Sequence, residues 1–158
     1  MFAQKDSPAV ESKRGLVVSV SAPASDVGAA ILAKGGNAVD GAVDTAFAVC
    51  VRHPSAGNIG GGGFMIIRLA NGTATTIDYR ERAPGKSTPT MYLDSTGNIN
   101  RSLTAVGWLA PGVPGTVRGM EMAHKKYGKL PWAEVVRPAA ELATKGWALS
   151  PALARSIN

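Results

Sequence analysis

Four consecutive glycines at residues 60–63 constrain the fold of this 158-residue chain more than any other sequence feature. Glycine weakens the interior of a helix or a strand, and it lets another backbone approach where a side chain would not fit. The run follows residues 38–51, whose apolar side chains repeat at helical spacing, and it precedes the apolar run 64–69. We therefore predict a helix, a glycine-rich connection and then a strand.

The segment after the glycines predicts a β-hairpin. Nearly all of residues 64–69 are apolar, which is typical of a strand covered on both faces. Asn71-Gly72 predicts a type I′ turn, in which both central residues adopt positive φ. Residues 75–79 should form the return strand, which ends beside Arg80.

Turn and capping residues delimit the other expected elements. The first are a strand at residues 16–20, a helix capped by Ser25 and Asp26 and stopped by Gly35-Gly36, and a helix capped by Asn37 and ended by Pro54. After the hairpin we expect a loop with short strands at residues 83–109 and a helix at 116–127 that Gly128 ends. A helix from Pro131 to about residue 144, which Pro138 would end or kink, and a helix opened by Ser150-Pro151 complete the chain. Such a mixture predicts layered α and β structure.

Composition excludes several functional classes. The formal net charge is +6, but the basic residues are scattered and do not alternate with aromatic residues as in grooves that bind single-stranded nucleic acid. We therefore expect no nucleic-acid partner. No apolar run reaches the ~18 residues of a membrane-spanning helix. Cys50 is the only cysteine, so we interpret it as a small buried residue rather than a nucleophile.

The remaining polar motifs give weak indications of chemistry. A phosphate-binding loop needs a helix after its glycines, whereas a strand is predicted here, so phosphate binding is disfavoured. The glycines either allow close packing or border a substrate pocket. We interpret His53, beside Ser55, as structural, and we place His124 on a solvated helix face. No group of residues has metal-ligand spacing, and we expect neither a metal nor a cofactor.

Arg80 is the strongest candidate for a binding residue. Its planar guanidinium can hold a carboxylate through two charge-assisted hydrogen bonds. Asp78 and Glu81 flank it and could orient it, or one of them could consume it in an internal salt bridge. Spacing alone does not decide between these two readings. Arg82 competes for the role, although a surface charge is the better interpretation.

Taken together, these residues closely resemble the N-terminal part of the gamma-glutamyltransferases, also called gamma-glutamyl transpeptidases. The likeness covers about residues 16–158. The matching motifs are Ala22-Pro-Ala-Ser25, Gly35-Gly-Asn-Ala-Val-Asp40, His53-Pro54, Gly57-Asn-Ile-Gly-Gly-Gly-Gly-Phe-Met65, Tyr79-Arg-Glu81, Ala83-Pro84, Gly112-Val-Pro-Gly-Thr-Val117, Tyr127-Gly-Lys-Leu-Pro131 and Gly146.

The resemblance implies an α+β fold of the N-terminal nucleophile hydrolase type, an αββα sandwich that this chain represents only in part. Residues 15–158 would be the N-terminal portion of the large-subunit domain, and residues 1–14 a disordered tail. In such enzymes a precursor cuts itself, and the new N-terminal threonine of the small subunit attacks the γ-glutamyl amide of glutathione. That threonine is expected downstream of this chain, which would hold no catalytic residue and would be inactive alone. Arg80 would bind the α-carboxylate of the donor.

The resemblance also implies partners and a location. The expected partners are glutathione and other γ-glutamyl compounds, amino-acid or peptide acceptors, the rest of the large subunit and the small subunit. The family suggests a periplasmic or secreted protein, although the chain shows no signal peptide. Three alternatives stay open: a related cephalosporin or glutaryl acylase, a capsule-processing transpeptidase, and a homologue that lost the threonine and only binds.

Overall fold

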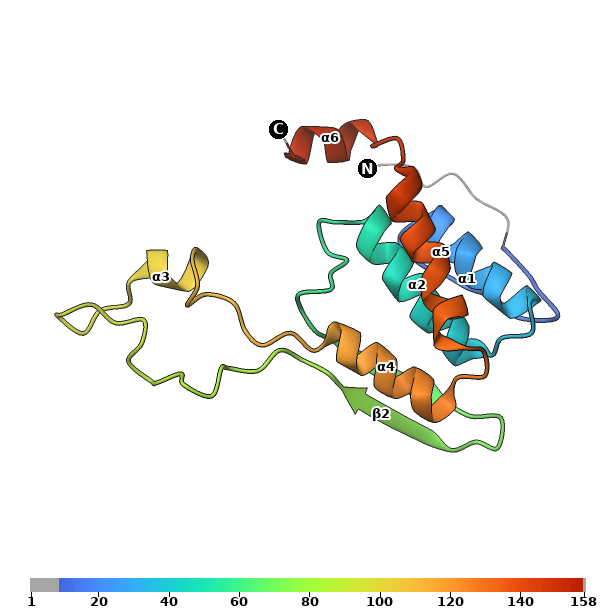
Figure 1. The fold of residues 1–158 in the computed structure, drawn as a ribbon, viewed down its shortest axis with the longest axis horizontal. Helices are drawn as coiled ribbons and strands as arrows, with labels where there is room; N and C mark the ends of the chain where they lie inside the picture. The colour runs from blue at the N-terminus through green and yellow to red at the C-terminus, as the bar shows by residue number, and fades with distance from the viewer. Residues whose placement is uncertain (1–8, 158) are drawn as a thin grey trace.

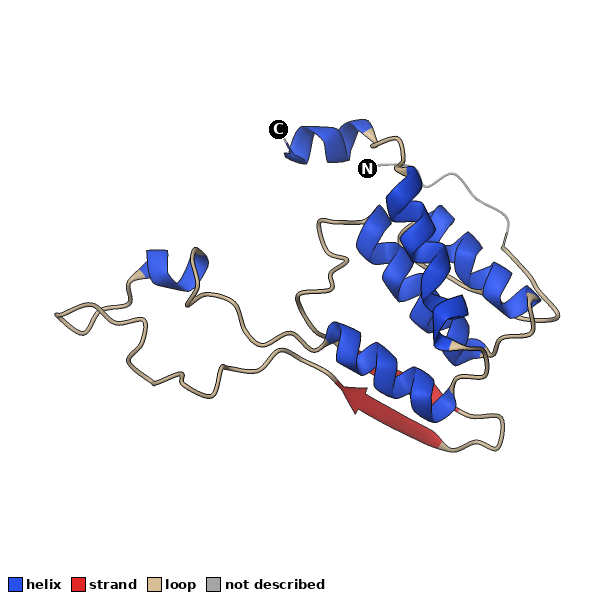
Figure 2. Cartoon of the chain, in the orientation of Figure 1, coloured by secondary structure: helices blue, strands red, loops and turns tan. Residues whose placement is uncertain are grey.

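A computed structural model describes residues 9–157 of the chain (Figure 1). Its elements in chain order are α1 (Ala22–Ala33), α2 (Ala38–Arg52), β1 (Phe64–Arg68), β2 (Ala74–Asp78), α3 (Arg101–Ala105), α4 (Thr116–Tyr127), α5 (Trp132–Lys145) and α6 (Pro151–Ile157). Figure 2 shows one hairpin among helices, a mixture of α and β structure as the sequence predicts. Residues 1–8 of the predicted tail lie outside the described residues.

Helix α2 is the central element. Asn37 caps it by accepting hydrogen bonds from the backbone amides of Val39 and Asp40, and the Asp40 carboxylate accepts one from the backbone amide of Asn37 in return. This reciprocal arrangement satisfies amide donors that the first turn of a helix leaves free. The helix ends at Arg52, two residues before Pro54, which confirms the predicted boundary.

Two groups of buried side chains pack around α2. Helices α1, α2 and α5 lie side by side, and α4 lies alongside the hairpin on the side that faces them (Figure 1). The larger buried group joins α2, the hairpin, α4 and α5, and it consists of Val39, Val43, Ile67, Ile77, Met120, Ala123 and Val135. The smaller group, Ala24, Ala48 and Ala139, joins α1, α2 and α5 through small side chains that allow close contact between helices.

The hairpin forms, but two of its predicted details are wrong. Strands β1 and β2 are antiparallel, with Phe64 opposite Asp78. Ile67 is buried whereas Ile66 is 80% exposed, so the described residues cover only one face of β1. The connection has three residues, 70–72, and only Gly72 has positive φ, at 88°. A three-residue loop that ends in a glycine of positive φ replaces the two-residue type I′ turn.

The N-terminal region differs from the prediction in two places. Residues 16–20 form no strand, because no described segment pairs with them, and Val18 is 80% exposed. Helix α1 starts at Ala22, earlier than Ser25 and Asp26 would allow as caps. Pro23 fixes its first turn, since proline lacks the amide donor that this turn leaves free.

The later helices follow the prediction more closely. Helix α4 has the predicted bounds and ends at Gly128. Helix α5 runs past Pro138 to Lys145, so the proline does not end it. Buried Val135 and Ala139 flank this position, and their packing outweighs the hydrogen bond that proline cannot make.

A long loop separates the hairpin from α4. Residues 83–112 extend away from the body of the molecule and carry α3, which the sequence did not indicate (Figure 1). Asn100 caps this five-residue helix by accepting a hydrogen bond from the amide of Ser102. The loop returns to the body where Arg82 and Val113 exchange two backbone hydrogen bonds, of 3.2 and 2.8 Å.

Candidate functional site

Arg80 follows the last residues of β2, and both of its acidic neighbours contact it. The Asp78 carboxylate accepts a hydrogen bond from the backbone amide of Arg80 at 3.0 Å. The Glu81 carboxylate accepts one from Nε of the Arg80 side chain at 3.1 Å. Asp78 therefore fixes the backbone, and Glu81 orients the guanidinium.

The guanidinium of Arg80 lies over the Phe64 ring, 5.8 Å from its centroid, and its two terminal nitrogens have no hydrogen-bond partner within residues 9–157. Its only side-chain hydrogen bond leaves from Nε, and the side chain is 62% exposed. The pKa of Glu81 lies below its usual value, chiefly because its own backbone amide bonds the carboxylate and also because Arg80 does. Glu81 is thus ionised at neutral pH and occupies one edge of the fork. The two terminal nitrogens stay available for a second carboxylate.

One side of the Arg80 backbone lies against the glycine run. A methyl group placed on Gly62 would stand 2.5 Å from the carbonyl oxygen of Tyr79 and 2.8 Å from Cα of Arg80. A side chain at this position would push the two segments apart. In contrast, nothing lies within 4 Å of the corresponding point on Gly60. Gly62 therefore confirms the close-packing interpretation of the run, whereas a substrate pocket bordered by the glycines stays a prediction.

The other side of the same segment lies against the start of α4. A side chain on Gly115 would collide with the carbonyl of Tyr79, and one on Gly119 would collide with its ring. The Gly61 carbonyl accepts hydrogen bonds from the amides of Gly115 at 2.7 Å and Thr116 at 3.0 Å. The segment that carries Arg80 is therefore held between two glycine-lined surfaces that are bonded to each other.

Within residues 9–157 the other sequence-predicted candidates make no hydrogen bond or ion pair with the Arg80 side chain. Arg82 is exposed, and within residues 9–157 it makes two backbone hydrogen bonds to Val113 and no ion pair, which agrees with a surface charge. The Ser55 hydroxyl oxygen lies 3.5 Å from Nε2 of His53 at the surface, too far for a strong hydrogen bond. The Cys50 thiol is half-buried and donates to the carbonyls of Ala46 and Asn58. Burial raises its pKa, so the thiol stays protonated and is a poor nucleophile.

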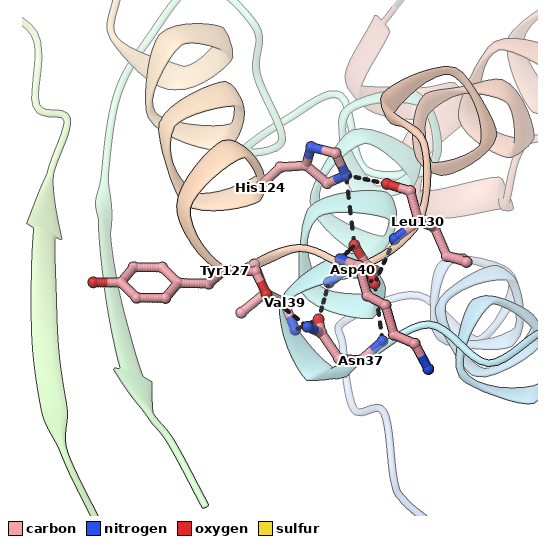
Figure 3. Close-up of polar contacts among 7 residues, drawn as sticks. Asn37, Val39, Asp40, His124, Tyr127 and Leu130 are labelled. Carbon is pink, nitrogen blue, oxygen red and sulfur yellow. Dashed lines mark hydrogen bonds and ion pairs between the residues drawn. The ribbon is translucent and has the colours of Figure 1, made fainter.

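The prediction for His124 is wrong, because its side chain is only 12% exposed (Figure 3). Its Nε2 donates to the Leu130 carbonyl at 2.8 Å and lies 3.5 Å from the Asp40 carboxylate. The turn after α4 folds back over the helix and buries this face. Sequence spacing could not reveal that return of the chain.

Asp40 is fully buried and was not singled out from the sequence. Its carboxylate accepts backbone hydrogen bonds from Asn37, Lys129 and Leu130, at 2.9 to 3.3 Å. Asn37 also donates to the Tyr127 carbonyl at 2.6 Å (Figure 3). These bonds join the start of α2 to the end of α4. The spacing of Asn37 and Asp40, three residues apart as in a capping box, was a signal that could have revealed this pair.

Asp44 lies one helical turn beyond Asp40 and is also fully buried, but neither of its carboxylate oxygens has a hydrogen-bond partner within residues 9–157. Burial raises its pKa to about 7, and the positive charge of Lys34 only partly offsets this effect. Asp44 is therefore largely neutral in mildly acidic solution.

The described part of the chain offers neither a metal site nor a membrane-spanning helix. Among residues 9–157, no three His, Cys, Asp or Glu side chains gather closely enough to hold a metal ion. In the same range, no helix has the length and apolar character needed to cross a membrane.

Comparison with known proteins places the chain in a family. The family model described as "Gamma-glutamyltranspeptidase" matches residues 24–158. The "Glutathione hydrolase proenzyme" of Escherichia coli (strain K12) is 51% identical over 149 residues, which are 94% of this chain and 26% of that protein. The chain thus spans about a quarter of the length of the curated relatives that it matches.

Solved structures agree with the sequence comparison. The crystal structure of Helicobacter pylori gamma-glutamyltranspeptidase matches with a TM-score of 0.91 and 48% identity, over 95% of this chain and 43% of that one. A cephalosporin acylase from Bacillus halodurans is more distant, at 26% identity and a TM-score of 0.75, over 98% of this chain and 30% of that one. These likenesses confirm the predicted α+β fold of the N-terminal nucleophile hydrolase type. The chain therefore belongs to the gamma-glutamyltranspeptidase family.

Proposed function

We propose that this chain is part of a glutathione hydrolase, or gamma-glutamyltransferase, and that Arg80 binds the α-carboxylate of the γ-glutamyl donor. The observation that carries the proposal is a guanidinium whose Nε bonds Glu81 while its two terminal nitrogens have no hydrogen-bond partner in the described part of the chain. The backbone around Arg80 packs between the glycine run and the start of α4, so the guanidinium extends from a fixed position. The names of the relatives supply the substrate class, glutathione.

The chemistry itself requires residues outside this chain. In the proposed mechanism a threonine hydroxyl, expected downstream, attacks the γ-carbonyl carbon and forms an ester with the glutamyl group. The amine of the donor leaves with a proton, and water or an amino acid then cleaves the ester. Backbone amides stabilise the oxyanion. Arg80 holds the far end of the donor so that the carbonyl lies in reach of the threonine, and the chain alone is inactive.

We further propose that the rest of the large subunit and the small subunit are its protein partners, and that the complete protein is periplasmic or secreted. The family membership supports both proposals. Glutathione, other γ-glutamyl compounds and amino-acid or peptide acceptors are the proposed small-molecule partners.

The test is a set of substitutions in the complete enzyme, assayed by release of p-nitroaniline from a γ-glutamyl anilide. Arg80→Ala should weaken donor binding by about 2 kcal/mol, because a charged group loses its hydrogen-bond partner. The Michaelis constant should then rise roughly thirtyfold. Arg80→Lys should restore part of the loss, since an ammonium provides charge but no planar fork.

Arg82→Ala is the matched control, because Arg82 is exposed and lies two residues from Arg80. It should leave the Michaelis constant within about twofold of the wild-type value. An unchanged constant in Arg80→Ala would return Arg80 to a structural ion pair with Glu81. Turnover of glutaryl amides in preference to γ-glutamyl amides would instead favour an acylase, and no turnover by the wild-type protein would favour a binding homologue.

A further inference from the structure

Asn58 connects two segments that lie on opposite sides of Arg80. Its side-chain Oδ1 accepts a hydrogen bond from the backbone amide of Gly61 at 2.8 Å and another from the hydroxyl of Thr116 at 3.0 Å. Thr116 is the first residue of α4 and is 6% exposed, and it lies 58 positions further along the chain. A single amide oxygen thus joins the glycine run to the start of that helix.

The backbone closes this connection into a ring. The Gly61 carbonyl accepts hydrogen bonds from the amides of Gly115 and Thr116, which belong to the first turn of α4. Gly61 is therefore bonded through its amide to Asn58 and through its carbonyl to the helix. Since Thr116 also bonds Asn58, each of the three residues is fixed by the other two.

Arg80 depends on the spacing that this ring sets. Gly62, the neighbour of Gly61, lies against Cα of Arg80, and Gly115 lies against the carbonyl of Tyr79. A change in the distance between the glycine run and α4 would therefore move the Arg80 backbone. Within residues 9–157 the hydrogen bonds of the Asn58 side chain go to Gly61, Thr116 and Ala56, so it acts on the guanidinium indirectly, through the glycine run.

We propose that Asn58 is a positioning residue for Arg80, an inference that rests on the proposed function of Arg80 as the ligand of the donor carboxylate. Four adjacent glycines permit the close approach, but they have the greatest backbone freedom of any sequence and do not order themselves. Asn58 supplies the restraint that they lack. A binding fork that is displaced by a fraction of an ångström loses much of its bidentate geometry.

The experiment is a double-mutant cycle in the complete enzyme, with a γ-glutamyl anilide as substrate. In the otherwise wild-type enzyme, which keeps Arg80, Asn58→Ala should raise the Michaelis constant on the order of tenfold and change kcat less than about twofold. In the Arg80→Ala background, Asn58→Ala should change the Michaelis constant by less than about twofold, because the group that it positions is gone.

Asn100→Ala is the matched control. The Oδ1 atom of Asn100 also accepts one backbone amide and one hydroxyl, both from Ser102, but it lies on the loop that extends away from the body (Figure 1). This substitution should leave the Michaelis constant unchanged. Thr116→Val and Thr116→Ser form a second pair that tests the same ring if Asn58→Ala does not fold. Valine should raise the constant and serine, which keeps the hydroxyl, should restore it.

The outcomes separate the two hypotheses. If Arg80→Ala leaves the Michaelis constant unchanged, the proposed role of Arg80 fails, and with it this inference. If Arg80→Ala raises the constant while Asn58→Ala has no effect, or has the same effect in both backgrounds, only the positioning role of Asn58 is overturned. Equal constants for Thr116→Val and Thr116→Ser would also overturn it.

Discussion

Replacing Asp44 by asparagine should change how the stability of the protein depends on pH. Asp44 is fully buried on α2, and neither carboxylate oxygen has a hydrogen-bond partner. Lys34 is the charged group that partly offsets the effect of burial on its pKa. Asparagine has nearly the same shape but does not titrate, so the substitution removes the ionisation and leaves the packing in place.

The raised pKa of Asp44 determines whether the protein gains or loses stability as pH rises. The folded protein retains the Asp44 proton up to about pH 7, whereas a carboxyl group with the ordinary pKa of 3.8 releases it earlier in the unfolded chain. The folded state therefore binds more protons between these two values, and stability falls as pH rises through this window. At ~1.4 kcal/mol for each pKa unit, the ionised group costs about 4 kcal/mol above pH 7, as an upper bound.

Thermal unfolding of the complete protein at pH 5 to 8 measures this effect. The protonated Asp44 carboxyl has no hydrogen-bond partner within residues 9–157, and the asparagine amide takes the same place, so the two proteins should differ in how their stability changes with pH. Between pH 5 and pH 8 the wild type should lose up to ~3 kcal/mol of stability relative to the variant, because only its carboxyl group titrates. Asp26→Asn, an exposed position on α1, should give a curve parallel to that of the wild type. A parallel curve for Asp44→Asn as well would refute the reasoning.

Two further comparisons test the packing around the site. Gly62→Ala should lower the free energy of unfolding by ~1–3 kcal/mol and raise the Michaelis constant, because its methyl group would stand 2.5 Å from the Tyr79 carbonyl. Gly60→Ala, whose methyl group meets nothing within 4 Å, should change the free energy of unfolding by less than ~0.5 kcal/mol. Equal effects of the two substitutions in denaturation and kinetics would contradict this account. His124→Ala should lower the free energy of unfolding, measured by urea denaturation, by ~1–3 kcal/mol, because the Leu130 carbonyl loses its donor. His53→Ala should lower it much less, since the side chain of His53 makes one weak hydrogen bond, to Ser55. A larger loss for His53→Ala than for His124→Ala would place His124 at the surface.

Local signals in the sequence predicted the elements whose ends depend on nearby residues. Helix α4 has the predicted bounds because Gly115 and Gly128 flank it, and α2 starts where Asn37 can cap it. Features that depend on distant residues were missed. Residues 16–20 have strand-forming side chains, but a strand also needs a partner to accept its hydrogen bonds, and the described chain offers none.

The candidate site shows the same division. The predicted hairpin placed Arg80 at the end of a strand, and the flanking acidic residues indicated how its side chain could be oriented. The sequence could not show which of them contacts the guanidinium, because Asp78 and Glu81 both lie within two residues of Arg80. It also could not connect Asn58 with Thr116, since 58 positions separate them. Burial of Asp44 depends on the packing of neighbouring helices, which no local pattern on α2 reveals.

The ion pair with Glu81 explains why an arginine, rather than any cation, suits this position. A pair of opposite charges has little net field, so a donor carboxylate gains little from simple attraction at a distance. In the role proposed for Arg80, binding comes from directed hydrogen bonds, and arginine can direct them because Nε bonds Glu81 while the two terminal nitrogens are left for the donor carboxylate. A lysine has one nitrogen, which would have to serve both carboxylates at once. Lysine would therefore recover only part of the affinity, even though its charge is the same.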